Sequence, residues 1–279
     1  MNALDDWVNA RRDRLTWLDS GRYVRSVFAG GQDGWYDDPA TLVAATVQAQ
    51  PLLRSDVHAI AVLGPFSRHL ALAGAAADAP AVCAVLAQDK PRRLLAETID
   101  ALLHKFGDRV DIALDCPSPR GLLPAGGEAD LDDLDDIAAG LLDVIRTVAD
   151  RPVRGLAISS DTAPGPEEDE TESWSSLLAA ARHYGWVTAI RLDGVTDHGQ
   201  LDAGLPGDLL LLPRVPPGAL PDDRRHGGGL PPEAWADTSA AGQLIDTAAR
   251  RGFRFGEIPH DAPPETVLTR INTLQAAEH

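Results

Sequence analysis

Short apolar runs alternate with helical segments along this chain, and that alternation limits the fold more than any other feature of the sequence. Between the runs, leucine, isoleucine and valine recur at three- and four-residue spacing, which is typical of amphipathic helices. Continuous apolar strands that alternate with helices form parallel sheets covered on both faces. The runs are RYVRSVFA (22–29), VHAIAVL (57–63), VDIALD (110–115), VRGLAIS (153–159), WVTAIRL (186–192), DLLLLP (208–213) and FRFGEI (253–258).

Seven or eight strand–helix units in one chain favour a closed (β/α)8 TIM barrel of the α/β class over an open, doubly wound sheet. AVCAVLA (81–87) is an eighth candidate strand, although a short apolar run of this kind also forms helices. No Gly-x-Gly-x-x-Gly pattern follows any run, which removes the usual dinucleotide-binding motif. The length of 279 residues suits one barrel, so we predict a single domain over 1–279.

Two segments lie outside the alternation. Residues 1–20 are predicted to form an N-terminal helical extension before the first strand. Residues 214–236 are rich in proline, glycine and charge, and loops of that length in a compact domain are often lids. We therefore predict a lid at 214–236, with Arg224, Arg225 and His226 as candidate substrate contacts.

Composition narrows the partners and the location. The net charge of −17 at pH 7 repels phosphate backbones and anionic membranes, so we expect no nucleic acid and no membrane as partner. No apolar run reaches the length of a membrane span, and the charged N-terminus lacks a signal-peptide core, so we expect a cytoplasmic protein. Two cysteines exclude a disulfide scaffold and a cysteine-only metal site. A monomer or a homodimer is expected.

Polar residues follow the predicted strands, where barrel enzymes carry their active sites. Arginine and aspartate recur there, which suits a small substrate held through its carboxylates by guanidinium groups. Each residue has a plain alternative as a helix cap or turn residue, because Asp and Ser after a strand are favoured there. The positions singled out are Arg68, Asp115, Cys116, Ser159, Asp161, Arg191, Asp193, Arg214, Glu257, His260 and Asp261.

The segment VDIALDCPSPRGLLP (110–124) carries the most chemistry. Its strand ends in Asp115, which should emerge at the barrel rim beside an arginine, because a buried carboxylate is costly unless it is paired. Cys116 is a candidate nucleophile if a nearby arginine lowers its pKa, and a small buried thiol otherwise. His260 is a candidate general base, with Asp115 or Glu257 as its partner.

This segment resembles the strand of cobalamin-independent methionine synthases that ends Asp-Glu-Pro and continues to Leu-Pro, here Asp115-Cys116-Pro117 and Leu123-Pro124. AVLGPFSRHLALAG (61–74) resembles a strand end of the same family and the Gly-x-Pro-Phe-Thr pattern of uroporphyrinogen decarboxylases. WLDSGRYVR (17–25) is similar to a Gly-Arg-Tyr stretch of those decarboxylases, whose arginine contacts a substrate carboxylate; that arginine falls on Arg22. The two families share a barrel superfamily.

The zinc ligands of the synthases are missing from the matching positions. Their His-x-Cys pair falls on Ser159 and Ser160, their glutamate falls on Arg191, and their late cysteine segment reads Pro259-His260-Asp261-Ala262. Zinc needs N and S ligands of that kind, and a guanidinium repels a metal ion. We therefore predict a protein without zinc or another cofactor.

What the resemblance implies is a metal-free enzyme of the lyase or decarboxylase type, acting by acid–base chemistry on a small carboxylate-bearing substrate. Asp115, Asp161 and His260 are the candidate catalytic groups. The candidate substrate contacts are Arg22, Arg68, Ser159, Arg191, Asp193, Arg214 and Asp261. Three alternatives stay open: a methyltransferase with a different donor or acceptor, a ligand-binding barrel without chemistry, and a Schiff-base aldolase that uses Lys90, which requires 81–87 to be a strand.

Overall fold

The structure is a computed structural model that describes residues 2–31, 34–74, 78–124, 129–163, 165–201 and 204–276. Within these residues, eight parallel strands pair in sequence order and close into a barrel, which confirms the predicted (β/α)8 fold. The strands are β1 (Leu15–Asp19), β2 (Val57–Ala61), β3 (Asp111–Pro117), β4 (Gly155–Ser160), β5 (Val187–Leu192), β6 (Leu209–Leu212), β7 (His226–Gly229) and β8 (Phe253–Glu257).

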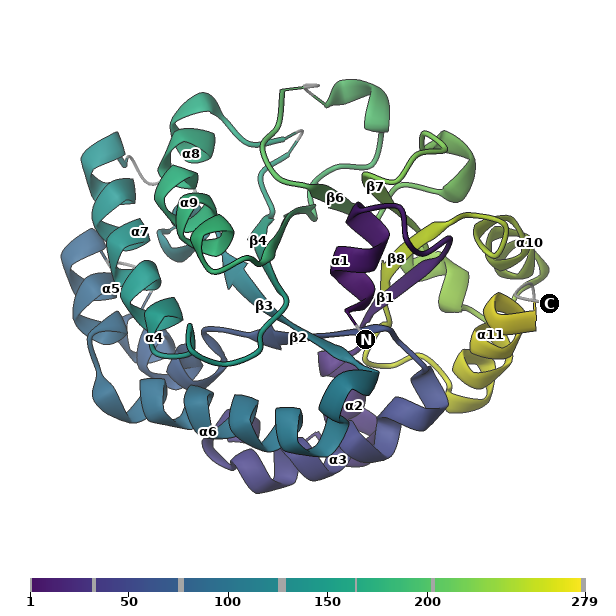
Figure 1. Ribbon diagram of the computed structural model, residues 1–279, viewed down its shortest axis with the longest axis horizontal. Helices are drawn as coiled ribbons and strands as arrows, with labels where there is room; N and C mark the ends of the chain where they lie inside the picture. Colours follow the sequence, from purple (N-terminus) through teal and green to yellow (C-terminus); the bar gives the residue numbers. More distant parts are fainter. Residues whose placement is uncertain are drawn as a thin grey trace.

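Helices surround the barrel, and a short one lies over its centre in the view of Figure 1. The helices are α1 (Ala3–Val8), α2 (Gly21–Phe28), α3 (Pro39–Leu53), α4 (Ser67–Ala73), α5 (Ala79–Leu86), α6 (Asp89–Phe106), α7 (Leu131–Arg146), α8 (Glu168–Ser173), α9 (Ser175–His183), α10 (Ser239–Ala248) and α11 (Pro264–Ala276). No helix among the described residues is both long and apolar enough to cross a membrane.

Side chains alternate along each strand between the barrel interior and the surrounding helices. The inward set forms a separate core that includes Trp17 of β1, Ala113 of β3 and Phe255 of β8. The outward set, with Leu114 and Ile158 among its members, packs against the helices in a larger core. One end of the interior is closed by α1, whose Leu4 and Trp7 are buried in the inward core. The opposite, C-terminal end of the strands is left to polar side chains.

The first strand does not lie where the sequence predicts it. RYVRSVFA (22–29) falls almost entirely within the helix α2, and the strand is LTWLD (15–19), inside the predicted N-terminal extension. The helix buries Tyr23 and Val24 and ends at Phe28, so its apolar residues gather on one side as in a surface helix. The prediction of a strand at 22–29 is therefore wrong, because these residues have the spacing of a helix rather than the alternation of a strand.

The predicted lid over 214–236 contains the barrel strand β7, with the sequence HGGG. Its glycines give no apolar strand signal, yet each is required by a close neighbour. A Cβ on Gly227 would lie 2.5 Å from the Phe253 ring, and one on Gly228 would lie 2.7 Å from the Leu212 carbonyl oxygen. Arg224 is also occupied at the closed end, where its guanidinium lies 4.5 Å from the Trp7 ring and donates to backbone carbonyls. The segment 214–236 is therefore not one continuous loop, because residues 226–229 form a barrel strand, and a role as a lid stays a prediction for the rest of it.

The segment 81–87 is helical, as part of α5, which settles the ambiguity in the sequence. Lys90 lies in the first turn of α6 and is exposed, rather than at the end of a barrel strand. The condition on which the Schiff-base alternative depends is therefore not met.

Candidate functional site

The polar residues at the open end of the barrel come from the same inward-facing rows as the core. Asp19 follows Trp17 on β1, Asp115 follows Ala113 on β3, and Glu257 follows Phe255 on β8, each two residues further along its strand. Register places Asp19 opposite Glu257, and Ser159 opposite Arg191. Because every second side chain of a strand points inward, these polar residues form a layer directly above the apolar interior of the barrel.

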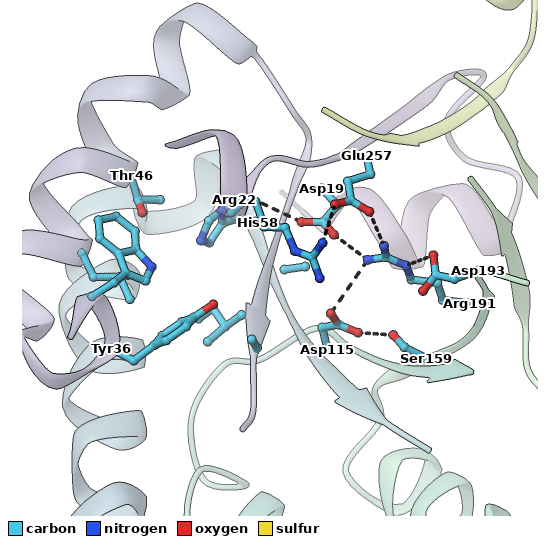
Figure 2. Close-up of a pocket in the computed structure, with 16 residues that line it drawn as sticks. Asp19, Arg22, Tyr36, Thr46, His58, Asp115, Ser159, Arg191, Asp193 and Glu257 are labelled. Carbon is cyan, nitrogen blue, oxygen red and sulfur yellow. Dashed lines mark hydrogen bonds and ion pairs between the residues drawn. The ribbon is translucent and has the colours of Figure 1, made fainter. Parts of the chain in front are cut away.

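Arg191 of β5 is the centre of this layer, with a side chain only 9% exposed. Its Nε donates to Asp193 Oδ1 at 2.9 Å, and its Nη2 donates to Glu257 Oε2 at 2.9 Å. Its Nη1 donates to Asp19 Oδ2 at 2.5 Å and lies 3.9 Å from Asp115 Oδ2. Surrounding carboxylates hold the pKa of Arg191 well above its usual value despite its burial. We call these five residues the arginine–carboxylate cluster; Figure 2 shows Asp19 and Glu257 above the Arg191 side chain and Asp115 below it.

The pKa values of Asp115 and Asp19 are shifted in opposite directions in this cluster. Burial raises the pKa of Asp115, and the negative charges of Asp19 and Asp193 add to that effect, while Arg191 and the Ser159 hydroxyl oppose it. Burial also acts to raise the pKa of Asp19, but its direct contact with Arg191 outweighs burial and leaves the pKa below its usual value. Two aspartates in one site therefore differ in their readiness to carry a proton, a pattern typical of acid–base sites.

Ser159 orients Asp115. The serine hydroxyl donates a hydrogen bond to Asp115 Oδ1, so the other carboxyl oxygen, Oδ2, faces Arg191 and the cavity. The hydroxyl belongs to the next strand, β4, whose residue 159 pairs in register with Pro117 of β3. The predicted rim position of Asp115 beside an arginine is thus what the structure shows, with Arg191 as the arginine.

A cavity of about 300 Å³ opens beside the cluster; we call it the inner cavity. The cluster forms one wall, and side chains from η1 (Trp35–Asp37), α3 and β2 form another, with Tyr36 and Thr46 on the left in Figure 2. Its lining residues are Asp19, Gly21, Arg22, Trp35, Tyr36, Leu42, Thr46, His58, Ala59, Ile60, Ala61, Asp115, Ser159, Arg191, Asp193 and Glu257.

A second cavity of about 340 Å³ shares five of these residues and extends over the ends of β3 to β6; we call it the outer cavity. Arg22 belongs to both cavities; its side chain is 81% exposed and its Nη1 lies 3.8 Å from Glu257 Oε1. Arg214 is exposed and lines only the outer one. The outer cavity is lined by Arg22, Pro117, Gly121, Ser159, Asp161, Arg191, Asp193, Pro213, Arg214, Pro232 and Glu257.

Tyr36 is held in the inner cavity by a glycine. A Cβ on Gly64, in η2 (Gly64–Phe66), would lie 2.4 Å from the Tyr36 ring, so only glycine leaves room for the ring. Burial raises the pKa of Tyr36, and the charges of Asp19 and Asp115 raise it further, so the phenol stays protonated. The Gly-Pro strand end noted in the sequence thus has a packing role next to the cavity.

His58 of β2 is a half-buried histidine that lines the inner cavity. Burial lowers its pKa to about 4, against the opposing charge of Asp19, so its imidazole is neutral at physiological pH. Its ring packs edge-on against Phe106, with 5.9 Å between centroids. His58 is therefore a hydrogen-bonding or packing group at neutral pH rather than a cation.

The structure brings together part of the set singled out in the sequence. Asp115, Ser159, Arg191, Asp193 and Arg22 share the inner cavity, and Asp161 and Arg214 join them at the outer one. Arg68 instead lines a third cavity, of about 660 Å³, which adjoins the inner cavity through Trp35 and Tyr36. His260 and Asp261 are exposed just beyond β8 and line none of these three cavities.

Cys116 does not fit the role of nucleophile. It follows Asp115 by one residue and therefore points to the opposite side of the strand, where it is fully buried in the outward core. Burial and the neighbouring charge of Asp115 raise the pKa of the Cys116 thiol far above its usual value. The alternative of a small buried thiol is the correct one.

The lining residues of the inner cavity that the sequence does not identify include Asp19, Trp35, Tyr36 and His58. Asp19 ends a strand that was mistaken for part of an extension, and His58 lies inside a predicted strand rather than at its end. Trp35 and Tyr36 come from a connection between helices, where no periodic signal exists. Glu257 was recognised as a strand end, but without its contact to Arg191.

The described residues contain no group of three or more His, Cys, Asp or Glu side chains arranged to hold a metal ion. Several carboxylates do converge at the rim, but the Arg191 guanidinium lies among them and supplies the positive charge that they require. The absence of zinc stays a prediction, which elemental analysis of the untagged protein tests.

Comparisons with known proteins add little to this geometry. No family model matches the sequence, and no curated protein is significantly similar to it. Among solved structures, the chain is similar to the apo form of the homocysteine methyltransferase MmuM from Escherichia coli, at 16% identity and a TM-score of 0.49, over 99% of this chain and 100% of that one. It is also similar to 2,3-dimethylmalate lyase, a PEP mutase/isocitrate lyase superfamily member, at 12% identity and a TM-score of 0.37, over 100% of this chain and 86% of that one.

Proposed function

We propose that the protein is an enzyme that transfers a proton through Asp115 in a lyase- or decarboxylase-type reaction of a small carboxylate-bearing substrate. The observation that carries the proposal is the state of Asp115, a half-buried carboxyl group that lines a cavity and whose pKa is raised by desolvation and by neighbouring carboxylates. General acids are tuned in this way, so that they hold a proton nearer to neutral pH.

In a decarboxylation, the bond between the substrate carbon and its carboxylate breaks and the electron pair stays on the carbon. That cleavage releases carbon dioxide; protonated Asp115 then donates its proton to the carbanion, and the resulting Asp115 carboxylate recovers a proton from the solvent. Ser159 stabilises that carboxylate through its hydrogen bond. Arg191, 3.9 Å away, limits the charge that would otherwise accumulate.

The arginines divide into two roles. Arg191 uses Nε and both terminal nitrogens on carboxylates of the protein, so we assign it a positioning role. Arg22 and Arg214 are exposed around the outer cavity, and we propose that they contact the substrate carboxylate. Asp161 lines the same cavity and is a weaker candidate for the proton-transferring group, because it is exposed.

The test is proton exchange and carbon dioxide release in D2O, followed by NMR over a panel of 2-oxo, 3-oxo and malonate-type acids. We expect the wild-type protein to act on at least one compound and Asp115→Asn to be about 100-fold slower or worse. Asp143→Asn is the matched control, since Asp143 is exposed on α7. Equal rates for wild type and Asp115→Asn, or an inert wild-type protein, would contradict the proposal; an inert protein that still binds these acids would be a ligand-binding barrel.

Arg22→Gln and Arg214→Gln test substrate binding separately. With the compound that is turned over, we expect each substitution to raise KM by about tenfold with little change in kcat, because it removes a contact made equally in the ground and transition states. An unchanged KM in both variants would show that the substrate carboxylate does not bind in the outer cavity.

A further inference from the structure

The inner cavity carries an excess of negative charge. Its lining includes four carboxyl groups, those of Asp19, Asp115, Asp193 and Glu257, against the two guanidinium groups of Arg22 and Arg191. His58 does not change this balance, because burial lowers its pKa to about 4. Even with Asp115 protonated, one negative charge remains unmatched. A cavity with such a lining attracts a cation and repels an anion.

The guanidinium groups are poorly placed to reverse this preference. Arg191 is almost fully buried, and its nitrogens already donate to Asp19, Asp193 and Glu257. Arg22 is mostly in solvent at the mouth. An anion in the inner cavity would therefore have to displace a carboxylate of the protein from Arg191, at the cost of leaving that carboxylate unpaired.

The rest of the lining is apolar or aromatic. Trp35, Leu42 and Ile60 are buried around the same space, and the Tyr36 ring is fixed by Gly64. Figure 2 shows Tyr36 on the side of the cavity away from Asp19 and Glu257. Aromatic faces also favour cations over anions. At about 300 Å³ the space is at the lower end of the range for ligand sites.

We propose that the inner cavity binds the protonated amine of a small ligand, with the ammonium group toward the carboxylates of Asp115, Asp193 and Glu257 and an apolar substituent against Trp35, Leu42 and Ile60. This inference rests on the proposed function only in that Asp115 belongs to both. It concerns the end of the substrate that enters the barrel, whereas Arg22 and Arg214 would contact a carboxylate at the other end, in the outer cavity.

The test uses two probes of nearly equal shape and opposite charge, cyclohexylammonium and cyclohexanecarboxylate. Binding of each to the full-length protein is measured by isothermal titration calorimetry near neutral pH and at low salt. We expect cyclohexylammonium to bind at least about tenfold more tightly than the carboxylate, and the preference to weaken as salt is raised. Equal affinities, tighter binding of the carboxylate, or no binding of either probe would overturn the proposal.

Variants locate the bound ammonium. Glu257→Gln and Asp193→Asn each remove one negative charge but keep an oxygen that accepts from Arg191, and we expect each to weaken cyclohexylammonium binding by about tenfold. Glu265→Gln, at the exposed start of α11, is the matched control and should bind as the wild type does. Circular dichroism and thermal unfolding show that each variant is folded. Wild-type affinity in both site variants would place the ammonium elsewhere and overturn the proposal.

This outcome is separable from that of the proposed function. Proton exchange with the acid panel depends on Asp115 as a proton carrier, whereas ammonium binding is read without turnover. A protein that prefers cyclohexylammonium but whose turnover survives Asp115→Asn would retain the inference and lose the reaction. A protein whose turnover depends on Asp115 but that does not prefer cyclohexylammonium would support the proposed reaction and contradict the amine site.

Discussion

A single arginine holds the carboxylates at the mouth of this barrel together. Arg191 is held on β5 and reaches Asp19 on β1, Glu257 on β8 and Asp193 on its own strand's continuation. Without it, like charges from different strands would lie close together, on side chains that are only 22–26% exposed. A lysine could not take its place, since an ammonium lacks the planar fork that serves several partners at once.

Arg191→Met should therefore be strongly destabilising. The change keeps an unbranched apolar stem but leaves half-buried carboxylates unpaired, which costs up to about 3–5 kcal/mol of the free energy of unfolding. Urea unfolding near neutral pH measures this loss. Arg146→Met, in an exposed pair with Asp143, is the control and should cost less than about 1 kcal/mol.

The loss in Arg191→Met should also depend on pH. Arg191 lowers the pKa of Asp19 in the folded state, so this contribution to stability is present above the ordinary Asp value of 3.8 and is lost as the pH falls through the folded pKa. The difference between wild type and variant should shrink at acid pH. A difference that stays constant down to that range would show that lost packing, rather than charge, causes the effect.

Asp115→Asn should increase the free energy of unfolding near neutral pH, whereas Arg191→Met should decrease it. The pKa of Asp115 is raised in the folded state, so its favourable contribution is complete below 3.8 and is lost as the pH rises through the folded pKa. Asparagine cannot ionise and can still accept from Ser159. We expect the variant to be more stable by about 0.5–2 kcal/mol near neutral pH, with no gain at acid pH, measured by thermal unfolding across pH. A variant that is less stable near neutral pH would contradict the raised pKa.

At the scale of the elements, strands that carry apolar side chains could be predicted from the sequence, and β7 could not. The runs at 57–63, 110–115, 153–159, 186–192, 208–213 and 253–258 each overlap a barrel strand. The strand β7 is held by the closeness of Gly227 and Gly228 to Phe253 and Leu212, which is a tertiary condition without a local signal. The strand β1 was missed because an amphipathic helix with Val and Tyr follows it and resembles a strand more closely.

The same distinction applies to the site. Asp115, Ser159 and Arg191 could be predicted because each terminates a continuous apolar run, and period-two alternation then turns all three inward. The roles of these three residues could not be predicted. Whether Arg191 binds the substrate or the protein depends on Asp19 and Glu257, which are 172 and 66 residues away in sequence. Tyr36 and Trp35 come from a connection, where only the folded chain shows that they reach the cavity.

The contact between η1 and η2 makes a prediction at this scale. In Gly64→Ala the new methyl group would meet the Tyr36 ring at 2.4 Å, so the ring must move and the inner cavity must change shape. We expect a loss of about 1–3 kcal/mol in the free energy of unfolding. Gly218→Ala, where a Cβ meets nothing within 4 Å, should be nearly neutral.

A double-mutant cycle identifies the cause. If the Tyr36 ring is the obstacle, Gly64→Ala should cost little in a Tyr36→Ala background, so the two changes should be strongly non-additive in urea unfolding. Additive costs would show that residue 64 is constrained by its own backbone instead.

Across the whole molecule, the two ends of the barrel are built for different purposes. The end near the strand starts is apolar and closed by α1, whose Leu4 N–H donates to Asp111 Oδ2 at 2.8 Å at the beginning of β3. The other end gathers the charged groups and the cavities. In barrel enzymes, the first end governs stability and the second carries activity.

Trp7→Ala tests that division. The Trp7 ring packs on Phe253 with 5.7 Å between centroids, lies 4.5 Å from the Arg224 guanidinium, and donates from Nε1 to the Arg224 carbonyl at 2.7 Å, so one side chain of α1 ties β8 to the segment before β7. Its removal leaves a cavity at the closed end and should cost about 3–5 kcal/mol in urea unfolding. Leu72→Ala, at a side chain 77% exposed on α4, should be close to neutral.

Because Trp7 lies at the end of the barrel away from the cluster, cyclohexylammonium should bind the folded Trp7→Ala variant with wild-type affinity. A parallel loss of stability and of binding would show instead that the closed end and the open end are coupled through the barrel interior.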